Sequence, residues 1–115
     1  MEIVCSSCGT QNTLLDAKAL ASAVCEQCQN PLAPNKLVEL TDANFLPFLG
    51  GTDAPVLVYF YAPHCATCRS VGPRFEELAK KTPQLLAAKL NTVSQYRTVQ
   101  AIGLRGIPAL ALYHQ

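Results

Sequence analysis

The chain has 115 residues and a formal net charge of +1, and half of its residues are hydrophobic while only 15% are charged. This composition is typical of a globular protein with a buried core and excludes a disordered polypeptide. The near-zero net charge, without any run of lysine or arginine, excludes a dedicated nucleic-acid-binding protein.

The first residues have neither the basic region nor the long apolar region of a secretory signal, and no apolar run is long enough to span a membrane. We therefore expect a cytoplasmic protein with no membrane partner. Cytoplasmic thiols are kept reduced, so paired cysteines there bind metal or undergo redox chemistry more often than they form permanent disulfides. This matters because all six cysteines of the chain fall into three C-x-x-C pairs.

Residues 1–33 contain the first two pairs, Cys5/Cys8 and Cys25/Cys28, within a polar, turn-rich segment. The spacing of the pairs is typical of a zinc ribbon, in which four thiolates surround one ion. So little apolar surface cannot offset the ordering entropy of the segment, whereas tetrathiolate zinc contributes roughly 10 kcal/mol or more to folding. Four sulfur ligands leave no position for water, so we predict one structural Zn²⁺. The alternative is two disulfides or four unbound thiols.

Turn residues follow both pairs. We expect Gly9 and Asn30 to adopt the positive φ that such turns require. Pro31 and Pro34 then indicate a linker. The chain is thus expected to divide into a zinc ribbon and a second domain, residues 1–33 and 34–115.

The second part of the chain alternates between apolar, β-rich runs and segments with helical spacing, which predicts an α/β domain. The run "PVLVYFYA" is uninterrupted and apolar, as in a strand buried on both faces of a largely parallel sheet. Strands are predicted at 36–40, 55–62, 85–91 and 107–113, and helices at 41–50, 65–81 and 94–103.

Particular residues mark the predicted helix boundaries. Thr41 or Asp42 is expected to cap the first helix, and Ser94 the third, which should end at Gly103. Pro73 should kink the second helix, because proline lacks the amide donor of the helical hydrogen-bond ladder.

The third pair, Cys65 and Cys68 in "YAPHCATCRS", follows the buried strand and begins the long helix. Unpaired amides and the dipole at a helix start favour an anion, which lowers the pKa of a thiol there and makes Cys65 the candidate nucleophile. Cys68 lies one turn further along the same face, within disulfide reach. The pair suits a cycle in which Cys65 attacks a substrate disulfide and Cys68 resolves the mixed disulfide.

The stretches "VLVYFYAPHCATCRSVGPRFEELA", "AKLN" and "GLRGIPAL" resemble the thioredoxin family from its second strand to its proline loop. With the four-cysteine ribbon in front, nearly the whole chain resembles the zinc-ribbon members of that family, the thioredoxin-2 kind. The resemblance implies a thioredoxin-like three-layer α/β/α fold, shortened at its C-terminus. It also implies a thiol–disulfide oxidoreductase that reduces disulfide-bearing protein substrates and receives electrons from a thioredoxin reductase.

The resemblance further implies where substrate binds. Ile107 and Pro108 should form a cis peptide facing the active cysteines, with the backbone of Ile107 pairing with substrate. His64 is a third candidate for this surface, and when protonated it can stabilise the thiolate of Cys65. The alternative for His64 is an exposed loop residue with no role.

The active-site region departs from the family at several positions. Tyr59 replaces a buried aspartate, and a phenol is a poor base for the resolving thiol. Ala66-Thr67 replaces Gly-Pro between the cysteines, which should make the couple more oxidising. His64 replaces tryptophan, Lys89 has lost its expected aspartate partner, and Ala109 replaces threonine.

The family also has a further strand and a closing helix after the strand at 107–113. Without them that strand is an exposed edge, and one face of the sheet loses its cover. Either the sequence is truncated or another chain supplies the surface, and we expect a homo-oligomer that buries residues 107–113.

Two other functions remain open from the sequence. One is a non-catalytic, zinc-dependent binding or redox-sensing module with a thioredoxin-like fold, in which Cys65 and Cys68 merely switch between thiol and disulfide. The other is a second metal site that combines these cysteines with His64, although adjacency to Cys65 points the histidine ring away from a shared ion.

Overall fold

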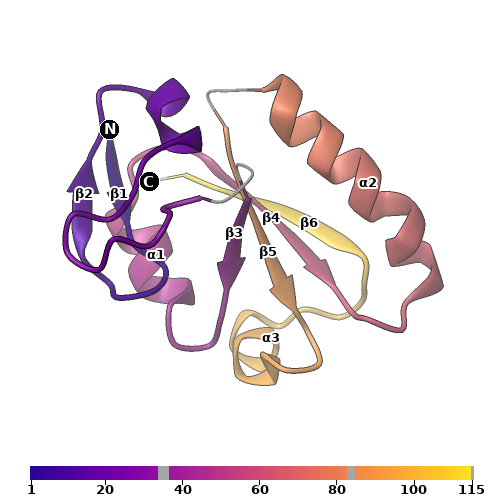
Figure 1. Cartoon of the computed structure of the whole chain (residues 1–115). Coiled ribbons are helices and arrows are strands. Elements are labelled where there is room, and N and C mark those ends of the chain that lie inside the picture. Colours follow the sequence, from indigo (N-terminus) through magenta and orange to yellow (C-terminus); the bar gives the residue numbers. More distant parts are fainter. Residues whose placement is uncertain (34–36, 83–84, 115) are drawn as a thin grey trace.

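A four-stranded sheet forms the centre of the molecule in the computed structural model, which describes residues 1–33, 37–82 and 85–114 (Figure 1). The strand order is β3-β5-β4-β6. Strands β3, β5 and β4 run parallel, and β6 pairs antiparallel with β4. The strands span Leu37–Leu40 (β3), Val56–Tyr61 (β4), Leu86–Asn91 (β5) and Ala109–Tyr113 (β6).

Three helices cover the two faces of this sheet. They are α1 (Phe45–Gly51), α2 (Ala66–Lys81) and α3 (Tyr96–Ile102). Alternate side chains of β4 point to opposite faces, so Val58 joins the core formed with α1 and α3, whereas Tyr59 packs under α2 with Phe75. The predicted three-layer α/β/α fold is confirmed.

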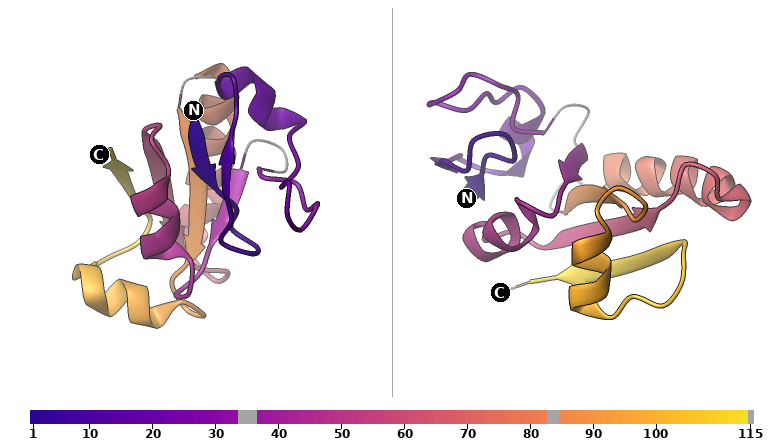
Figure 2. Two further views of the ribbon diagram at one scale, coloured as in Figure 1. Left: turned by 90° about the vertical axis from the view of Figure 1, so that its left-hand side faces the viewer. Right: turned by 90° about the horizontal axis from the view of Figure 1, so that it is seen from below.

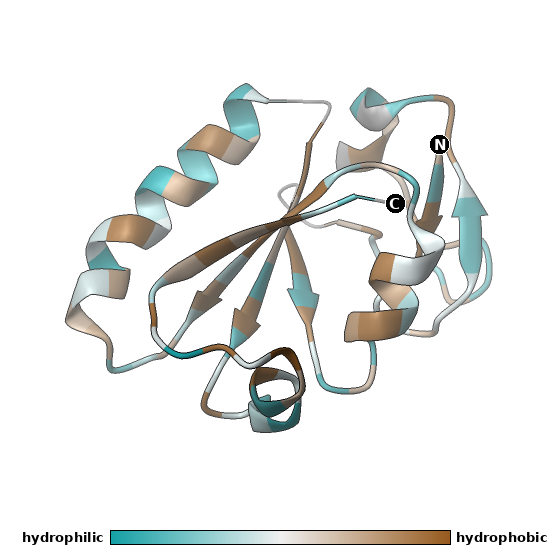
Figure 3. Cartoon of the chain, turned by 180° about the vertical axis from the view of Figure 1, so that it is seen from behind, coloured by the Kyte–Doolittle hydropathy of each residue, from teal (hydrophilic) through white to brown (hydrophobic). Residues whose placement is uncertain are grey.

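Strand β6 is an edge of the sheet, as the sequence predicts, although it begins at Ala109. Ala109 and Ala111 face the larger core, while Leu110 and Leu112 lie on the α2 side and are 50% and 63% exposed. Their cross-strand partners are Tyr59 and Leu57. Figure 3 shows this edge as a largely hydrophobic strand.

The amino-terminal segment forms a small hairpin of β1 (Glu2–Val4) and β2 (Gln11–Thr13), followed by the 3₁₀ helix η1 (Ala17–Ala21). It packs beside α1, on the opposite side of the molecule from the first turn of α2 (Figures 1 and 2). The predicted linker residue Pro31 belongs to this unit through a bridge to Val24. Pro34 and the predicted strand start at residue 36 lie outside the described residues.

Hydrogen bonds join the hairpin to the loop after α1. The buried hydroxyl of Thr52 accepts from the amide of Val4 at 3.2 Å, and Glu2 and Asp53 exchange two further bonds. At Gly51 a Cβ would collide with the side chain of Val4. One hydrophobic cluster contains both hairpin and sheet residues, so the two parts share a core.

Two predicted helix caps are wrong, and the helix stop is confirmed. Helix α1 begins after Asn44, and the carboxylate of Asp42 instead accepts hydrogen bonds from the amide and hydroxyl of Thr98 in α3. Thr41 accepts from the amide of Asn44, one turn ahead of the helix.

Helix α3 begins after Gln95 and not at Ser94, whose amide is bound by the side chain of Asn91. Gly103 ends the helix with φ of 71°, as expected. Helix α2 continues through Pro73. In the described residues, no helix has the length and apolar character that a membrane crossing requires.

Candidate functional site

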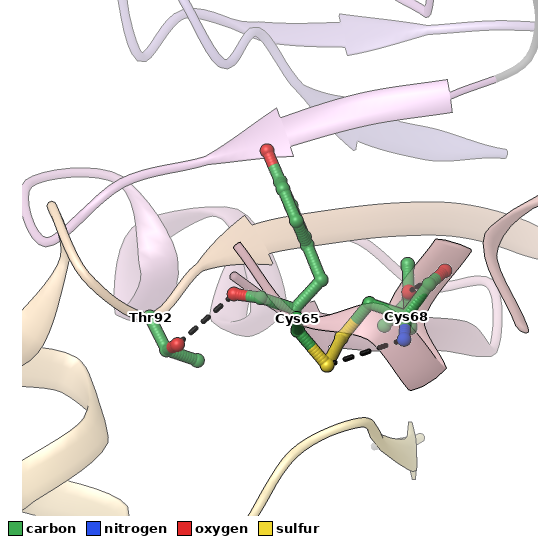
Figure 4. Close-up of a disulfide and its surroundings, with 5 residues drawn as sticks. Cys65, Cys68 and Thr92 are labelled. Atoms are coloured by element: carbon green, nitrogen blue, oxygen red, sulfur yellow. Dashed lines mark hydrogen bonds between the residues drawn. A yellow bond between two sulfur atoms is a disulfide. The ribbon is translucent and has the colours of Figure 1, made fainter. Parts of the chain in front are cut away.

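The cysteines of "PHCATC" form a disulfide at the start of α2 (Figure 4). Cys65 is the N-cap residue with extended backbone, and its sulfur accepts a hydrogen bond of 3.2 Å from the amide of Cys68. The Cys68 side chain is buried, at 6% exposure, while Cys65 is half-buried. The sulfur at the mouth of the helix is therefore the more accessible of the two.

Tyr59 lies beneath the disulfide and holds the first turn of α2. Its hydroxyl donates a hydrogen bond of 3.0 Å to the carbonyl oxygen of Cys68, and its ring stacks on Tyr61. Burial raises the pKa of the Tyr59 phenol, so this side chain stays neutral. The expectation that Tyr59 is a poor base agrees with this geometry, because its proton is already committed to a backbone carbonyl.

The loop between β4 and α2 is held from the neighbouring strand. The carbonyl oxygen of Tyr61 accepts a hydrogen bond of 2.8 Å from the amide of Thr92. It accepts another of 3.0 Å from the Thr92 hydroxyl (Figure 4). The amide of Cys65 donates to the carbonyl of Ala62. Sequence reasoning missed Thr92, because its role depends on the adjacency of β4 and β5.

A cavity of about 260 Å³, here called the disulfide cavity, lies between the disulfide, α2 and the sheet. Its lining includes Cys65, Cys68, Tyr61, Glu76 and Lys89. The ammonium nitrogen of Lys89 lies 5.6 Å from the centre of the Tyr61 ring, a cation–π arrangement. Lys89 therefore points toward the site, although its expected aspartate partner is absent.

Glu39 on β3 is a charged neighbour that sequence analysis missed. The hydroxyl of Tyr61 donates to its carboxylate at 3.4 Å. Burial raises the pKa of Glu39, while Lys89 and the bond from Tyr61 oppose that shift. In "KLVEL" the alternation of side chains places Glu39 on the other face of the strand from the buried Val38 and Leu40. Only the strand order brings Glu39 beside Lys89.

The predicted substrate-contact residues lie at the surface. Ile107 and Pro108 are joined by a cis peptide bond, as the resemblance implied. Ile107 and His64 are both exposed. These positions are open to a partner molecule.

The four amino-terminal cysteines converge, with all sulfurs within 4.8 Å of one another. The sulfurs of Cys5 and Cys28 are 3.7 Å apart, and those of Cys8 and Cys25 are 3.6 Å apart. A tetrahedral Zn²⁺ with sulfur ligands at about 2.3 Å requires sulfur–sulfur separations of about 3.8 Å. The donor set and its spacing thus fit a zinc ion. In the described parts of the chain, no other group of three or more potential ligands converges in this way.

Equivalent turns present the sulfurs of each pair. Gly9 donates its amide to the carbonyl of Cys5, and Gln29 does the same to Cys25. Gly9 has φ of 83° and Gln29 has φ of 69°, so the prediction of Asn30 for the second turn is wrong by one residue. Counting four residues from the first cysteine of each pair identifies both turn positions.

Asn12 joins the two halves of this cysteine cluster. Its buried side chain donates to the sulfur of Cys25 at 3.6 Å and accepts from the amide of Glu26 at 3.0 Å. Hydrogen bonds from the backbone of Cys28 and from Asn12 lower the pKa of Cys25 to about 6. Deprotonated sulfur is the form that binds a metal ion.

Comparison with known proteins identifies the family. The family model described as Thioredoxin matches residues 36–115. Thioredoxin C-3 of Corynebacterium nephridii is 36% identical over 115 residues, which cover 100% of this chain and 79% of that protein. Thioredoxin of Buchnera aphidicola subsp. Schizaphis graminum (strain Sg) is 38% identical over 81 residues, 70% of this chain and 75% of the relative.

A plant relative is matched over a smaller share of its length. Thioredoxin M5, chloroplastic, of Oryza sativa subsp. japonica is 33% identical over 94 residues, which cover 81% of this chain and 54% of that protein. The disulfide at the start of α2 agrees with these matches. The chain belongs to the thioredoxin family and is a thiol–disulfide oxidoreductase with a C-x-x-C pair.

Proposed function

We propose that the protein is a protein-disulfide reductase in which Cys65 is the nucleophile and Cys68 the resolving thiol. The observation that carries this assignment is the difference between the two sulfurs. Cys65 is the more accessible and lies at the start of α2, where the helix dipole and the Cys68 amide favour a thiolate. Cys68 is buried and lies within bonding distance of it.

The reaction balances over two exchanges. The Cys65 thiolate attacks one sulfur of a substrate disulfide, forms a mixed disulfide and releases the other sulfur as a thiolate. The Cys68 thiol loses its proton and its thiolate attacks the Cys65 sulfur, which releases the second substrate thiolate. The substrate has gained two electrons and the protein holds the Cys65–Cys68 disulfide, which a thioredoxin reductase would reduce again.

Substrate contact is assigned to His64, Ile107 and Pro108. All three are accessible at least in part, and Ile107 precedes β6, so its backbone has no strand partner within the described sheet. We propose disulfide-bearing proteins as substrates, electron transport in the cytoplasm as the setting, and no nucleic acid as partner.

The amino-terminal unit, residues 1–33, is proposed to be a structural zinc ribbon attached to a thioredoxin-like domain over residues 34–115. Cys5, Cys8, Cys25 and Cys28 would hold one Zn²⁺, which would close the fold of the ribbon. Four thiolates leave no open coordination position, so the ion takes no part in the redox step.

A homo-oligomer through β6 is also proposed. The exposed Leu110 and Leu112, together with the unpaired backbone of an edge strand, form a surface that a second copy can cover. Sedimentation at micromolar concentration tests this, and a strictly monomeric protein would contradict it.

The assignment of the cysteines is tested by reducing a protein disulfide with the wild type and Cys65→Ser, with zinc measured on the same samples. We expect the variant to lose activity and to keep one zinc per chain. Equal, negligible activity in both proteins would instead support the non-catalytic redox-sensing module. If the wild type holds a second equivalent of metal that Cys65→Ser lacks, the result would support the metal site that includes His64.

A further inference from the structure

Resolution of the mixed disulfide requires a proton acceptor for Cys68. The Cys68 side chain is buried, and only its thiolate attacks the Cys65 sulfur. Tyr59, directly beneath, donates its own proton to the Cys68 carbonyl and has a raised pKa because of burial. An acceptor other than Tyr59 is needed, either in the disulfide cavity or in a space that adjoins it.

A row of side chains crosses the sheet under α2 and includes a carboxylate. Glu39 on β3 is the register partner of Lys89 on β5, and Lys89 is the register partner of Tyr59 on β4. Register partners lie on the same face of a sheet. The row therefore places the Glu39 carboxylate two strands away from Tyr59, with the Lys89 ammonium between them.

Glu39 lines a space that adjoins the disulfide cavity and not that cavity itself. A second cleft, of about 790 Å³ and here called the ribbon cleft, is lined by residues that include Glu39, Ser6 and Lys80. Glu76 and Lys89 line both spaces, so the two adjoin. The disulfide cavity has room for several water molecules at about 30 Å³ each. Tyr61 lines the same cavity and donates its hydroxyl to Glu39.

We propose that Glu39 accepts the proton of the Cys68 thiol through water that fills the disulfide cavity and the adjoining ribbon cleft, with the hydroxyl of Tyr61 bound to the carboxylate and Lys89 beside it on β5. This rests on the proposed roles of Cys65 and Cys68. The proton moves from Cys68 to Glu39, the Cys68 thiolate forms the new bond to Cys65, and the substrate sulfur leaves as a thiolate. Glu39 is accessible to solvent and returns the proton there.

Other charged groups face the same space. Arg69 and Glu76 of α2 line the disulfide cavity, and Lys80 of α2 lines the ribbon cleft. Glu76 is the competing carboxylate, because it lines the disulfide cavity itself, but among the described residues no hydrogen bond or ion pair joins it to Tyr61 or Lys89. Glu39 accepts a hydrogen bond from Tyr61 and is the register partner of Lys89. Its pKa is raised toward neutral pH, where a base exchanges protons most effectively.

The test separates the two chemical steps. Reduced, zinc-loaded protein is mixed in a stopped-flow instrument with an aromatic disulfide that releases a coloured thiolate at each exchange. The first phase reports attack by Cys65 and the second reports resolution by Cys68. Cys68→Ser defines the amplitude of the first phase, and a Cys65→Ser/Cys68→Ser double variant gives the background from ribbon thiols.

Glu39→Gln keeps the shape of the side chain and an acceptor for Tyr61, so the fold is retained. We expect an unchanged first phase and a second phase at least about tenfold slower at pH 7, with its pH profile moved to higher pH. Glu39→Asp should recover part of the rate. Glu77→Gln is the matched control, because Glu77 pairs with Lys81 on the outer surface of α2, and it should leave both phases unchanged.

Several results would overturn the proposal. If Glu39 acts only through its charge, the pH profile of the second phase should move to lower pH in Glu39→Gln, since removing a nearby negative charge lowers the pKa of a thiol. An unchanged second phase in Glu39→Gln, or a slow second phase only in Glu76→Gln, would reject Glu39 as the acceptor. Absence of the first phase in the wild type would instead reject the proposed function itself.

Discussion

The hydroxyl of Tyr59 donates a hydrogen bond to the carbonyl oxygen of Cys68, across the buried contact between β4 and α2. The Tyr59 side chain thus binds the backbone at the start of α2 and not the thiol. Tyr59 therefore supports the position of Cys68.

Tyr59→Phe should therefore affect stability more than activity. Loss of one buried hydrogen bond is expected to lower the free energy of unfolding by about 1 kcal/mol. The rate of disulfide reduction should stay within about threefold of wild type, because Tyr59 is not the base. Urea unfolding and the reduction assay check the two parts, and a tenfold loss of rate with unchanged stability would contradict this role.

Substitutions at two neighbouring glycines of α1, Gly50 and Gly51, test the contact between this helix and the amino-terminal hairpin. A Cβ at Gly51 collides with Val4, while a Cβ at Gly50 meets no atom within 4 Å. Gly51→Ala should lower the free energy of unfolding by about 1–3 kcal/mol, the usual cost of overpacking. Gly50→Ala should be neutral or stabilising by up to about 1 kcal/mol, through helix propensity. Equal effects of the two substitutions would mean that the hairpin does not pack here.

If the four amino-terminal cysteines hold zinc as proposed, its removal should destabilise the whole chain and not only the ribbon. Hairpin residues share one hydrophobic cluster with β4 and α1, so loss of the ribbon exposes the domain core. We expect a chelator to lower the melting temperature of the helical circular-dichroism signal by at least about 10 °C. A helical signal that melts at an unchanged temperature would show that the ribbon folds independently.

Asp42 should make stability depend on pH in the acid range. Desolvation opposes the shift, but the hydrogen bonds from Thr98 outweigh it and lower the pKa of Asp42 below its ordinary value. A lowered carboxyl pKa adds stability that is fully present above the unfolded-state pKa and is lost as pH falls through the folded-state pKa. Below about pH 4, unfolding titrations should show a steeper loss for wild type than for Asp42→Asn. Parallel curves would contradict this.

Local sequence patterns were sufficient for the elements that carry the disulfide. The apolar run of β4 and the helical spacing after Cys65 are properties of consecutive residues, and the cysteine spacing defines both clusters. The stop at Gly103 was equally local, because glycine alone takes the left-handed conformation without strain.

Features that depend on strand order were not predictable from local patterns. Glu39 lies near Tyr61 and Lys89 only because β5 lies between β3 and β4. Asp42 binds Thr98 of the distant helix α3 and therefore does not cap α1, the helix that follows it in sequence. In the first turn of α3, the amide of Thr98 is bound by Asp42 and not by Ser94, whose own amide is bound by Asn91 ahead of the helix.

The division of roles between Cys65 and Cys68 is tested most directly by trapping the mixed disulfide. Reduced Cys65→Ser and Cys68→Ser variants are each incubated with a disulfide-bearing protein, and non-reducing mass spectrometry with peptide mapping locates the covalent bond. We predict a persistent conjugate through Cys65 in Cys68→Ser and none through Cys68 in Cys65→Ser. A conjugate that forms through Cys68 at a comparable rate would contradict the account.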